Sequence, residues 1–270
     1  MTLETTYAIP TLPAARTHTL ALLLQPHVSL SEVAAIAEAD PALTATLLRA
    51  ANSVASSPLD EVRRTSDALV RLGVDDSRGI ILATLLRDTT TGGLERSGIA
   101  LDEMWRHALG VALLTEATCS ADAAYEAVRP MAFTTGVLHH IGRLVLAAQH
   151  PRRYARVIRL IERGMSECEA EVSQFGVDHA AFGGGVALAW DLPSEIAQEI
   201  ASHHKGGSRL ADALHQSILL ARALGLGDGV MPVPVTSMNF SAAARMPPRL
   251  IGGPGALQRR IEWFRTALGA

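Results

Sequence analysis

The sequence predicts an all-α protein, and two observations carry this prediction. Hydrophobic residues make up 48% of the chain and are mostly Ala and Leu, whereas aromatic residues make up only 4%. Ala and Leu favour helices, and runs of the aromatic and β-branched residues that mark strands are sparse. In addition, helix-capping residues and apolar positions at helical spacing recur along most of the chain.

Capping residues mark the first predicted helices. Ser29 with Glu32 forms a capping box that opens one helix, and Asp40 followed by Pro41 opens the next. A short third helix is expected to end at Gly73, because glycine readily takes the left-handed conformation of a helix C-cap. A strongly apolar helix follows and is predicted to be central.

The chain is expected to divide into two helical lobes and a C-terminal extension. Residues 89–98, TTTGGLERSG, interrupt the helical pattern and predict a loop between lobes at about 12–90 and 101–225. The Gly-, Pro-, Met- and Ser-rich residues 226–254 predict an irregular arm. An amphipathic helix closes the sequence at 255–270, and we expect it to dock on its own domain, with partner binding or dimer formation as the alternative.

The second predicted lobe consists of successive helices. Ser166 with Glu169 forms a second capping box, and Asp178 is expected to cap a helix that contains three consecutive glycines. Glycine costs about 1 kcal/mol relative to alanine inside a helix, so the three glycines favour close packing by another helix. The helices are expected at 101–118, near 121–129, at 133–149 and 151–164, after Ser166, and at 179–190, 194–204 and 208–225.

Composition excludes several classes of function. The net charge of -3 and a pI near 6.4 argue against a broad nucleic-acid-binding surface. Cys119 and Cys168 form no spacing motif, which favours free thiols in a reducing compartment. No secretory signal and no apolar run of the ~20 residues needed to span a bilayer are visible. The sequence therefore predicts a cytoplasmic protein that binds neither nucleic acid nor membrane.

Six of the ten histidines lie on, or at the ends of, predicted helices, where they could converge. Helical bundles build metal sites from such inward-facing side chains, and neutral imidazoles suit Zn, Fe, Ni or Mn. The alternative is that these histidines only satisfy one another and nearby backbone groups in the core. The six are His107, His139, His140, His179, His203 and His204.

Four motifs, taken in order, carry a family resemblance. They are LSEVAAIAEADPALTATLLRAANS (30–53), SDALVRLGVDDSRGIILA (66–83), LHHIGRLVLAAQHP (138–151) and FGVDHAAFGGGVALAWDLPSEIAQEIASHH (175–204). Over residues 12–225 the chain resembles HDOD domains, which are related by fold to HD-type phosphohydrolases. The resemblance implies two helical lobes, with an HD-like second half.

The resemblance also implies an incomplete metal site. In HD enzymes a helix His, a His-Asp pair and a later Asp bind the metal; His107 and His139 match the two histidines, and His140 replaces the first Asp. Ile218 lies near the position of the later Asp, and Asp212 is more than a turn too early. Loss of carboxylates removes charge and bridging oxygens, so phosphodiesterase activity is disfavoured, although the imidazoles could still hold Zn or Fe.

Further ligand positions follow from the same resemblance. His179, His203 and His204 resemble the additional histidines of two-metal relatives, and Arg143 stands where those relatives carry Lys. These residues, with His107, His139 and His140, form the predicted ligand-binding centre. The predicted metal set is His107, His139, His140, His179 and His203.

The resemblance implies a non-catalytic bacterial signalling protein. It would act without an obligatory cofactor, through a partner signalling protein or a small ligand such as a nucleotide second messenger, and it could form a homodimer. A divergent metal-dependent HD-type phosphohydrolase using the histidine cluster is the alternative. No Walker, GxSxG, GxGxxG or HExxH pattern supports another enzyme class.

Overall fold

The computed structural model describes residues 7–25, 28–53, 61–90, 94–230 and 253–268, which are helical with no strand among them. The predicted all-α class is therefore confirmed. No helix in these ranges combines the length and apolar character needed to cross a bilayer. The α-helices are α1 (Ala14–Leu23), α2 (Leu30–Glu38), α3 (Pro41–Ala51), α4 (Thr65–Thr90), α5 (Leu101–Ala121), α6 (Arg129–Leu138), α7 (Ile141–Gln149), α8 (Pro151–Glu162), α9 (Glu167–Phe175), α10 (His179–Ala189), α11 (Ser194–Ser202), α12 (Arg209–Ala223) and α14 (Gly253–Leu268).

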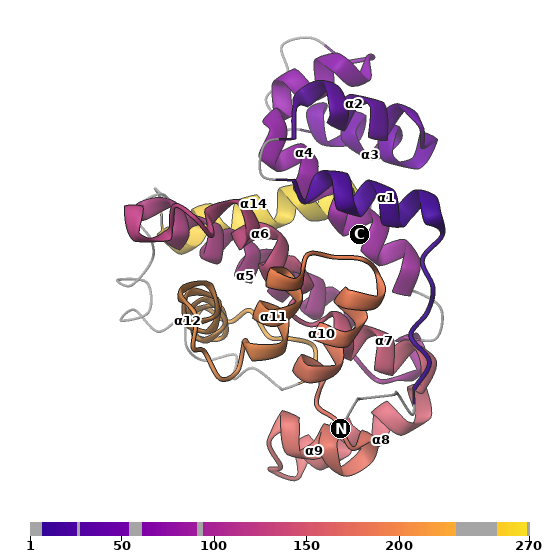
Figure 1. Cartoon of the computed structure of the whole chain (residues 1–270), viewed down its shortest axis with the longest axis vertical. Helices are drawn as coiled ribbons and strands as arrows, with labels where there is room; N and C mark the ends of the chain where they lie inside the picture. Colours follow the sequence, from indigo (N-terminus) through magenta and orange to yellow (C-terminus); the bar gives the residue numbers. More distant parts are fainter. Residues whose placement is uncertain (1–6, 26–27, 54–60, 91–93, 231–252, 269–270) are drawn as a thin grey trace.

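Helices α2, α3 and the start of α4 form one end of the molecule (Figure 1). The capping box of Ser29 and Glu32 is present, and the Asp40 side chain accepts a hydrogen bond from the backbone N–H of Ala42. Gly73 has φ of 79° and interrupts α4, as the sequence predicted. The chain changes direction there, so the second part of α4 crosses to the middle of the molecule.

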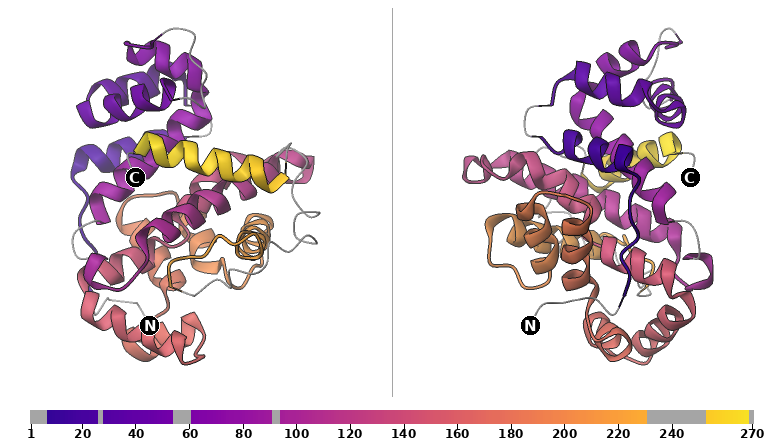
Figure 2. Two further views of the ribbon diagram at one scale, coloured as in Figure 1. Left: turned by 180° about the vertical axis from the view of Figure 1, so that it is seen from behind. Right: turned by 45° about the vertical axis from the view of Figure 1, so that its right-hand side comes forward.

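The remaining helices pack around α5 in the rest of the molecule. Helix α6 packs along one side of α5 and α12 contacts another, while α7 packs on α10 and α10 on α11. Helices α8 and α9 form a hairpin at the opposite end from α2 and α3, which both views of Figure 2 also show. The capping box of Ser166 and Glu169 and the Asp178 cap open α9 and α10 as predicted.

Two predicted elements of the second lobe were wrong. Residues 133–149 do not form one helix, because α6 ends at Leu138 and α7 begins at Ile141, with His139 and His140 between them. Near residues 121–129 the chain forms only a 3₁₀ turn, η3 (Ala123–Tyr125), and α6 begins at Arg129. The histidine pair therefore sits at the break between two helices, and both side chains are buried there.

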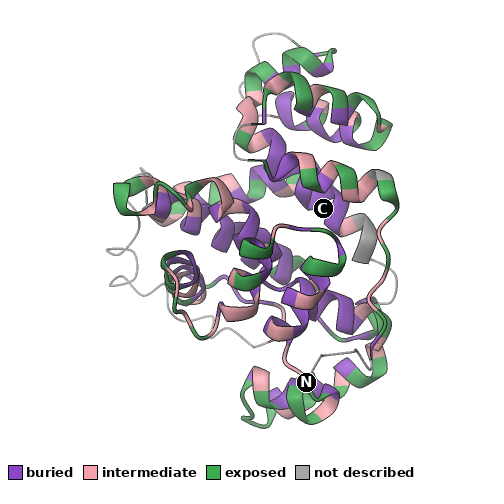
Figure 3. Ribbon diagram, viewed as in Figure 1, coloured by how far each residue is buried: buried purple, intermediate pink, exposed green. Residues whose placement is uncertain are grey.

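Most buried hydrophobic side chains belong to one cluster that runs through both predicted lobes, and two small clusters lie beside it (Figure 3). Helix α14 packs against α3, α4 and α5, so the prediction that the last helix docks on its own domain is confirmed. Its apolar face, Leu257, Ile261, Phe264 and Leu268, is buried. Most of the predicted irregular arm, residues 231–252, lies outside the described residues.

The segment before α1 packs on the second lobe rather than the first. The Tyr7 ring meets those of Phe175 and Phe182 edge-on, and the carbonyl of Pro10 accepts a hydrogen bond of 2.7 Å from Trp190 Nε1. Helix α1 itself contacts α2 and α4. Helix α14 follows the second lobe in the sequence, yet it packs on α3 and α4 of the first lobe as well as on α5.

Candidate functional site

The structure brings all six candidate histidines together. His107 lies on α5, the pair at 139–140 between α6 and α7, His179 at the start of α10, and the pair at 203–204 directly after α11. Ring centroids of His107 and His140 are 5.3 Å apart, and those of His140 and His179 are 4.9 Å apart. All are buried except His204, which is partly exposed.

Two glycines let the helices that carry these histidines approach closely. A Cβ on Gly142 of α7 would lie 2.2 Å from the carbonyl oxygen of His179. A Cβ on Gly136 of α6 would lie 2.4 Å from the Cα of Ala112 on α5. Real contacts of this kind are far longer, so a side chain at either position would push the paired helices apart. The packing of α6 on α5 and of α7 on α10 thus sets the spacing of the imidazoles.

Backbone carbonyls fix the orientation of three imidazoles. The Nδ1 atoms of His107, His139 and His203 lie 2.9, 2.6 and 2.7 Å from the carbonyl oxygens of Leu226, Gly136 and Ile200 respectively. A carbonyl oxygen only accepts, so each Nδ1 must carry the proton and each Nε2 a lone pair. This arrangement, with the second ring nitrogen donating to a carbonyl, is typical of metal-binding histidines.

His179 is oriented by a carboxylate. Its Nδ1 lies 2.6 Å from Glu171 Oε2, and its Nε2 lies 3.0 Å from His204 Nε2 and 3.3 Å from His203 Nε2. Because Nδ1 of His203 already donates to a carbonyl, its Nε2 lone pair faces His179 without a proton to share. A cation between these nitrogens would satisfy both lone pairs.

The histidine centre fits an imidazole-bound ion. Nitrogens of His107, His139 and His140 lie within 4.8 Å of one another, as do those of His140, His179 and His203. The Nε2 atoms of His107 and His139 are buried and have no hydrogen-bond partner in the described part of the chain. Three neutral imidazoles suit a borderline ion such as Zn²⁺ or Fe²⁺. The residues therefore fit such an ion, which when bound would act as a Lewis acid.

The histidines are held in the neutral form that a metal requires. Burial lowers the pKa of His107 to about 4. Burial, and then the neighbouring imidazoles, lower the pKa of His139 well below its ordinary value, and burial and Arg143 do the same for His140 and His179. Neutral rings avoid repulsion among six imidazoles packed in one place.

Arg143 lies beside the histidines with three carboxylates around its guanidinium. It is fully buried and forms ion pairs with Glu167, with Glu171 at 3.7 Å and with Asp228 at 3.1 Å. Although burial opposes the charged form, Tyr154 and then the carboxylates raise the pKa of Arg143 well above its ordinary value. The guanidinium is therefore a fixed internal cation.

A second arginine shares these carboxylates. Arg222 of α12 forms ion pairs with Glu167 and, at 2.6 Å, with Asp228. Glu171 also accepts a hydrogen bond of 2.6 Å from the Tyr154 hydroxyl. Three carboxylates and two guanidiniums leave one net negative charge in the group.

The expectation that too few acidic residues remain beside the histidines was wrong. One oxygen of Glu167 and one of Asp228 lie within 4.8 Å of a His140 nitrogen, although neither Asp212 nor the position of Ile218 supplies an acid. Glu167 appeared in the sequence only as an acid near a helix start, and Asp228 fell in the predicted arm. The sequence could have indicated one pair of these acids, because Glu167 and Glu171 are four residues apart and therefore lie on the same face of a helix.

The fold and the site together define an all-helical protein with a buried, imidazole-rich centre. The sequence matches the HDOD domain family over residues 9–206. The chain therefore belongs to the HDOD domain family.

Similar proteins extend the comparison. An uncharacterised protein of Treponema pallidum (strain Nichols) is 27% identical over 200 residues, 73% of this chain and 37% of that protein, so the chain spans little more than a third of this curated relative. A crystal structure of a provisionally named phosphohydrolase from Shewanella amazonensis SB2B has 23% identity, covers 96% of this chain and 93% of its own, with a TM-score of 0.68. The structure of a provisionally named signal transduction protein from Marinobacter aquaeolei VT8 is 19% identical to this chain. The match covers 97% of this chain and 59% of that protein, with a TM-score of 0.71. At these identities both structures establish the fold alone.

Proposed function

We propose that this HDOD protein is a non-catalytic regulator, and one observation carries the proposal. The guanidinium of Arg143 lies among Glu167, Glu171 and Asp228, the carboxylates beside the histidines. Hydrolysis of a phosphoester by an HD-type centre needs carboxylates to hold hard cations that activate water. Here those carboxylates already neutralise two arginine side chains, and little negative charge remains for a hard divalent ion.

Burial supports the same conclusion. The side chains of His107, His139 and His179 are 0% exposed, so a phosphoester has no access to their nitrogens in this conformation. An ion on one of the two imidazole groups would then act mainly by joining the helices that carry its ligands. Regulation would act through contacts with a partner signalling protein or a small ligand such as a nucleotide second messenger.

A divergent phosphohydrolase is the second candidate, because one observation favours it. Nitrogens of His107, His139 and His140, and those of His140, His179 and His203, gather within 4.8 Å as in metal-binding sites, and carbonyls orient three of these rings. Partly exposed His204 marks the side from which solvent comes nearest to the centre. An opening of α11 would be needed before a substrate could reach a metal there.

Elemental analysis and activity assays separate the two candidates. Protein purified without chelator is analysed for Zn, Fe and Mn and then assayed on cyclic dinucleotides and on a nitrophenyl phosphodiester with each metal added. We expect no turnover, whatever the metal content. Turnover that disappears in His139→Ala would show that the protein is an enzyme.

The role of the guanidiniums is tested by binding of Mn²⁺, measured by calorimetry. Arg143→Gln and Arg222→Gln each free carboxylates and should bind Mn²⁺ more tightly than the wild type. Arg222, 29% exposed, can be replaced with less risk to folding. Arg159→Gln on the exposed side of α8 is the control. Equal Mn²⁺ affinity in all four proteins would refute the idea that the arginines take the place of cations.

A further inference from the structure

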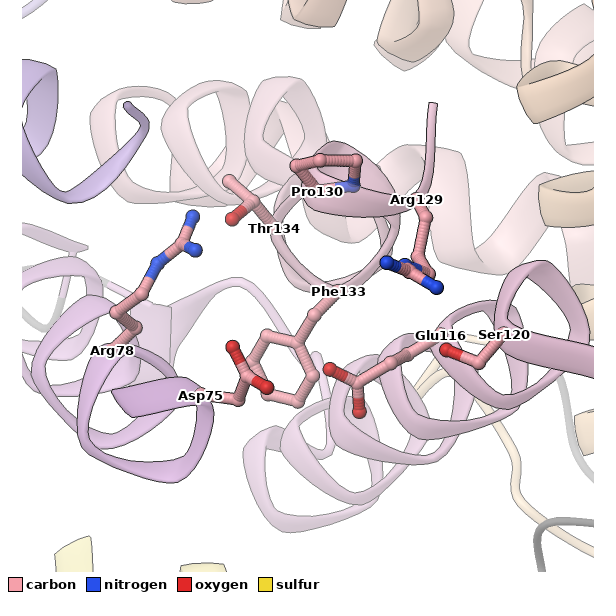
Figure 4. A pocket seen from close by; sticks show the side chains of 8 residues that line it. All are labelled: Asp75, Arg78, Glu116, Ser120, Arg129, Pro130, Phe133 and Thr134. Atoms are coloured by element: carbon pink, nitrogen blue, oxygen red, sulfur yellow. The ribbon is translucent and has the colours of Figure 1, made fainter. Parts of the chain in front are cut away.

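A hollow between α4, α5 and α6 lies outside the histidine centre and shares no residue with it. Its volume is about 380 Å³, within the range of small-molecule sites. Figure 4 shows side chains from all three helices converging on this space. The lining residues are Asp75, Arg78, Glu116, Ser120, Arg129, Pro130, Phe133 and Thr134.

Close packing of α4 on α6 builds one wall of the hollow. A Cβ on Gly79 would lie 2.7 Å from ring atoms of Phe133, so the absence of a side chain lets this ring rest on α4. The ring presents an apolar surface between the charged groups (Figure 4). The wall is therefore formed by packed elements of both predicted lobes.

One part of the hollow is cationic and rich in donors. Arg78 is only 8% exposed, and within the described ranges its guanidinium forms no hydrogen bond or ion pair. The buried Thr134 hydroxyl also has no hydrogen-bond partner in the described residues and points into the same space as Arg78 (Figure 4). Arg129 stands at the exposed rim, paired with Glu126. A buried guanidinium facing a hollow is an anion site, because guanidinium binds carboxylate and phosphate oxygens with two parallel hydrogen bonds.

Asp75 and Glu116 make another part of the hollow acidic, and their charges act on Arg78. Asp75 and Glu116 form no ion pair within the described residues, whereas the nearby Asp76 is paired with Arg260 of α14. Burial, followed by the charges of Asp75 and Asp76, raises the pKa of Glu116 to about 7. A cationic group placed there would relieve repulsion among these carboxylates.

We propose that this hollow binds a small zwitterion, a molecule with an oxyanion at one end and an ammonium or amidinium group at the other. The oxyanion would contact Arg78 and Thr134, and the cationic group would contact Glu116 and Asp75. Because α4 belongs to one predicted lobe and α5 and α6 to the other, the bound molecule would tie the lobes together. This site does not depend on whether the histidine centre is catalytic.

Calorimetric titration with ω-aminoalkyl phosphates of increasing chain length tests the proposal on the full chain. Each is compared with the alkyl phosphate and the alkylamine of the same length. We expect the best aminoalkyl phosphate to bind about tenfold more tightly than either the alkyl phosphate or the alkylamine of the same length, because it contacts both the cationic and the acidic side chains of the hollow. If no aminoalkyl phosphate binds more tightly than the alkyl phosphate and the alkylamine of the same length, the proposal is wrong.

Variants locate the binding. Arg78→Gln should reduce the affinity to that of the alkylamine, and Thr134→Val, which keeps the shape of the buried side chain, should weaken binding severalfold. Glu116→Gln should reduce the affinity to that of the alkyl phosphate. Arg159→Gln is the control with an exposed arginine removed elsewhere. Binding that persists unchanged in both Thr134→Val and Glu116→Gln would place the ligand outside this hollow.

Discussion

Replacement of Gly142 by alanine tests how closely α7 and α10 must approach to assemble the histidine centre. The new Cβ would lie 2.2 Å from His179 O, 2.5 Å from Gly183 N and 2.8 Å from Gly183 Cα. All three are backbone atoms of α10 and cannot rotate away. The helices would have to separate by roughly 1 Å to restore ordinary contact.

The expected cost follows from two opposing effects. Overpacking typically destabilises by about 1–3 kcal/mol, and rigid backbone obstacles favour the upper end of this range. Alanine gains about 1 kcal/mol over glycine in a helix, so the net loss for Gly142→Ala should be about 2 kcal/mol. Gly185→Ala is the matched control, because a Cβ there meets no atom within 4 Å, and it should stabilise by up to about 1 kcal/mol.

Urea denaturation followed by circular dichroism gives both values from the shift in midpoint at constant slope. In NMR spectra, the chemical shifts of the imidazole protons of the histidine centre should change in Gly142→Ala and stay unchanged in Gly185→Ala. Equal stability of the two variants would refute the argument that close helix approach at Gly142 builds the site.

Three further predictions concern single side chains. Glu116 binds its proton more tightly in the folded protein, because its pKa rises from 4.5 to about 7, so its ionisation reduces stability as pH rises through this interval. As pH rises from 4.5 to 7, the free energy of unfolding of Glu116→Gln should therefore increase by up to about 3 kcal/mol relative to that of the wild type. Denaturation curves measured across this pH range test this, and a stability difference that does not change with pH would contradict it. Asn52→Ala removes two 2.7 Å hydrogen bonds to the backbone of Val62 and should cost about 1–3 kcal/mol, whereas a neutral result would mean that water replaces both. Tyr154→Phe removes the 2.6 Å hydrogen bond to buried Glu171 and should lower stability by about 1.5–3 kcal/mol, and an unchanged melting temperature would count against a role for this bond.

Local features of the fold could be predicted because they depend on a few adjacent residues. The caps at Ser29, Asp40, Ser166 and Asp178 are all present, since each side chain bonds a backbone N–H two or three residues away. The bend at His139 could not be predicted in this way. Its flanking residues suit a helix, and the packing of α6 on α5 and α7 on α10 imposes the break.

The candidate site shows the same division between local and tertiary information. The histidines were recognised from their motifs, and the structure brings them together. The ion-pair partners of Arg143 are two carboxylates of α9 and Asp228, which lie from 24 to 85 positions further along the sequence. No local pattern records such convergence, because it is decided by how the helices cross.

The reciprocal crossing of Tyr7–Pro10 and α14 has a consequence for how this protein can be divided. Each half of the molecule carries packing surface that is completed by a piece of chain attached to the other half. Fragments separated at residues 91–93 should therefore be poorly folded alone and should reassemble when mixed. The folded protein would then form only when both fragments are present, so the pair of fragments could serve as a split reporter.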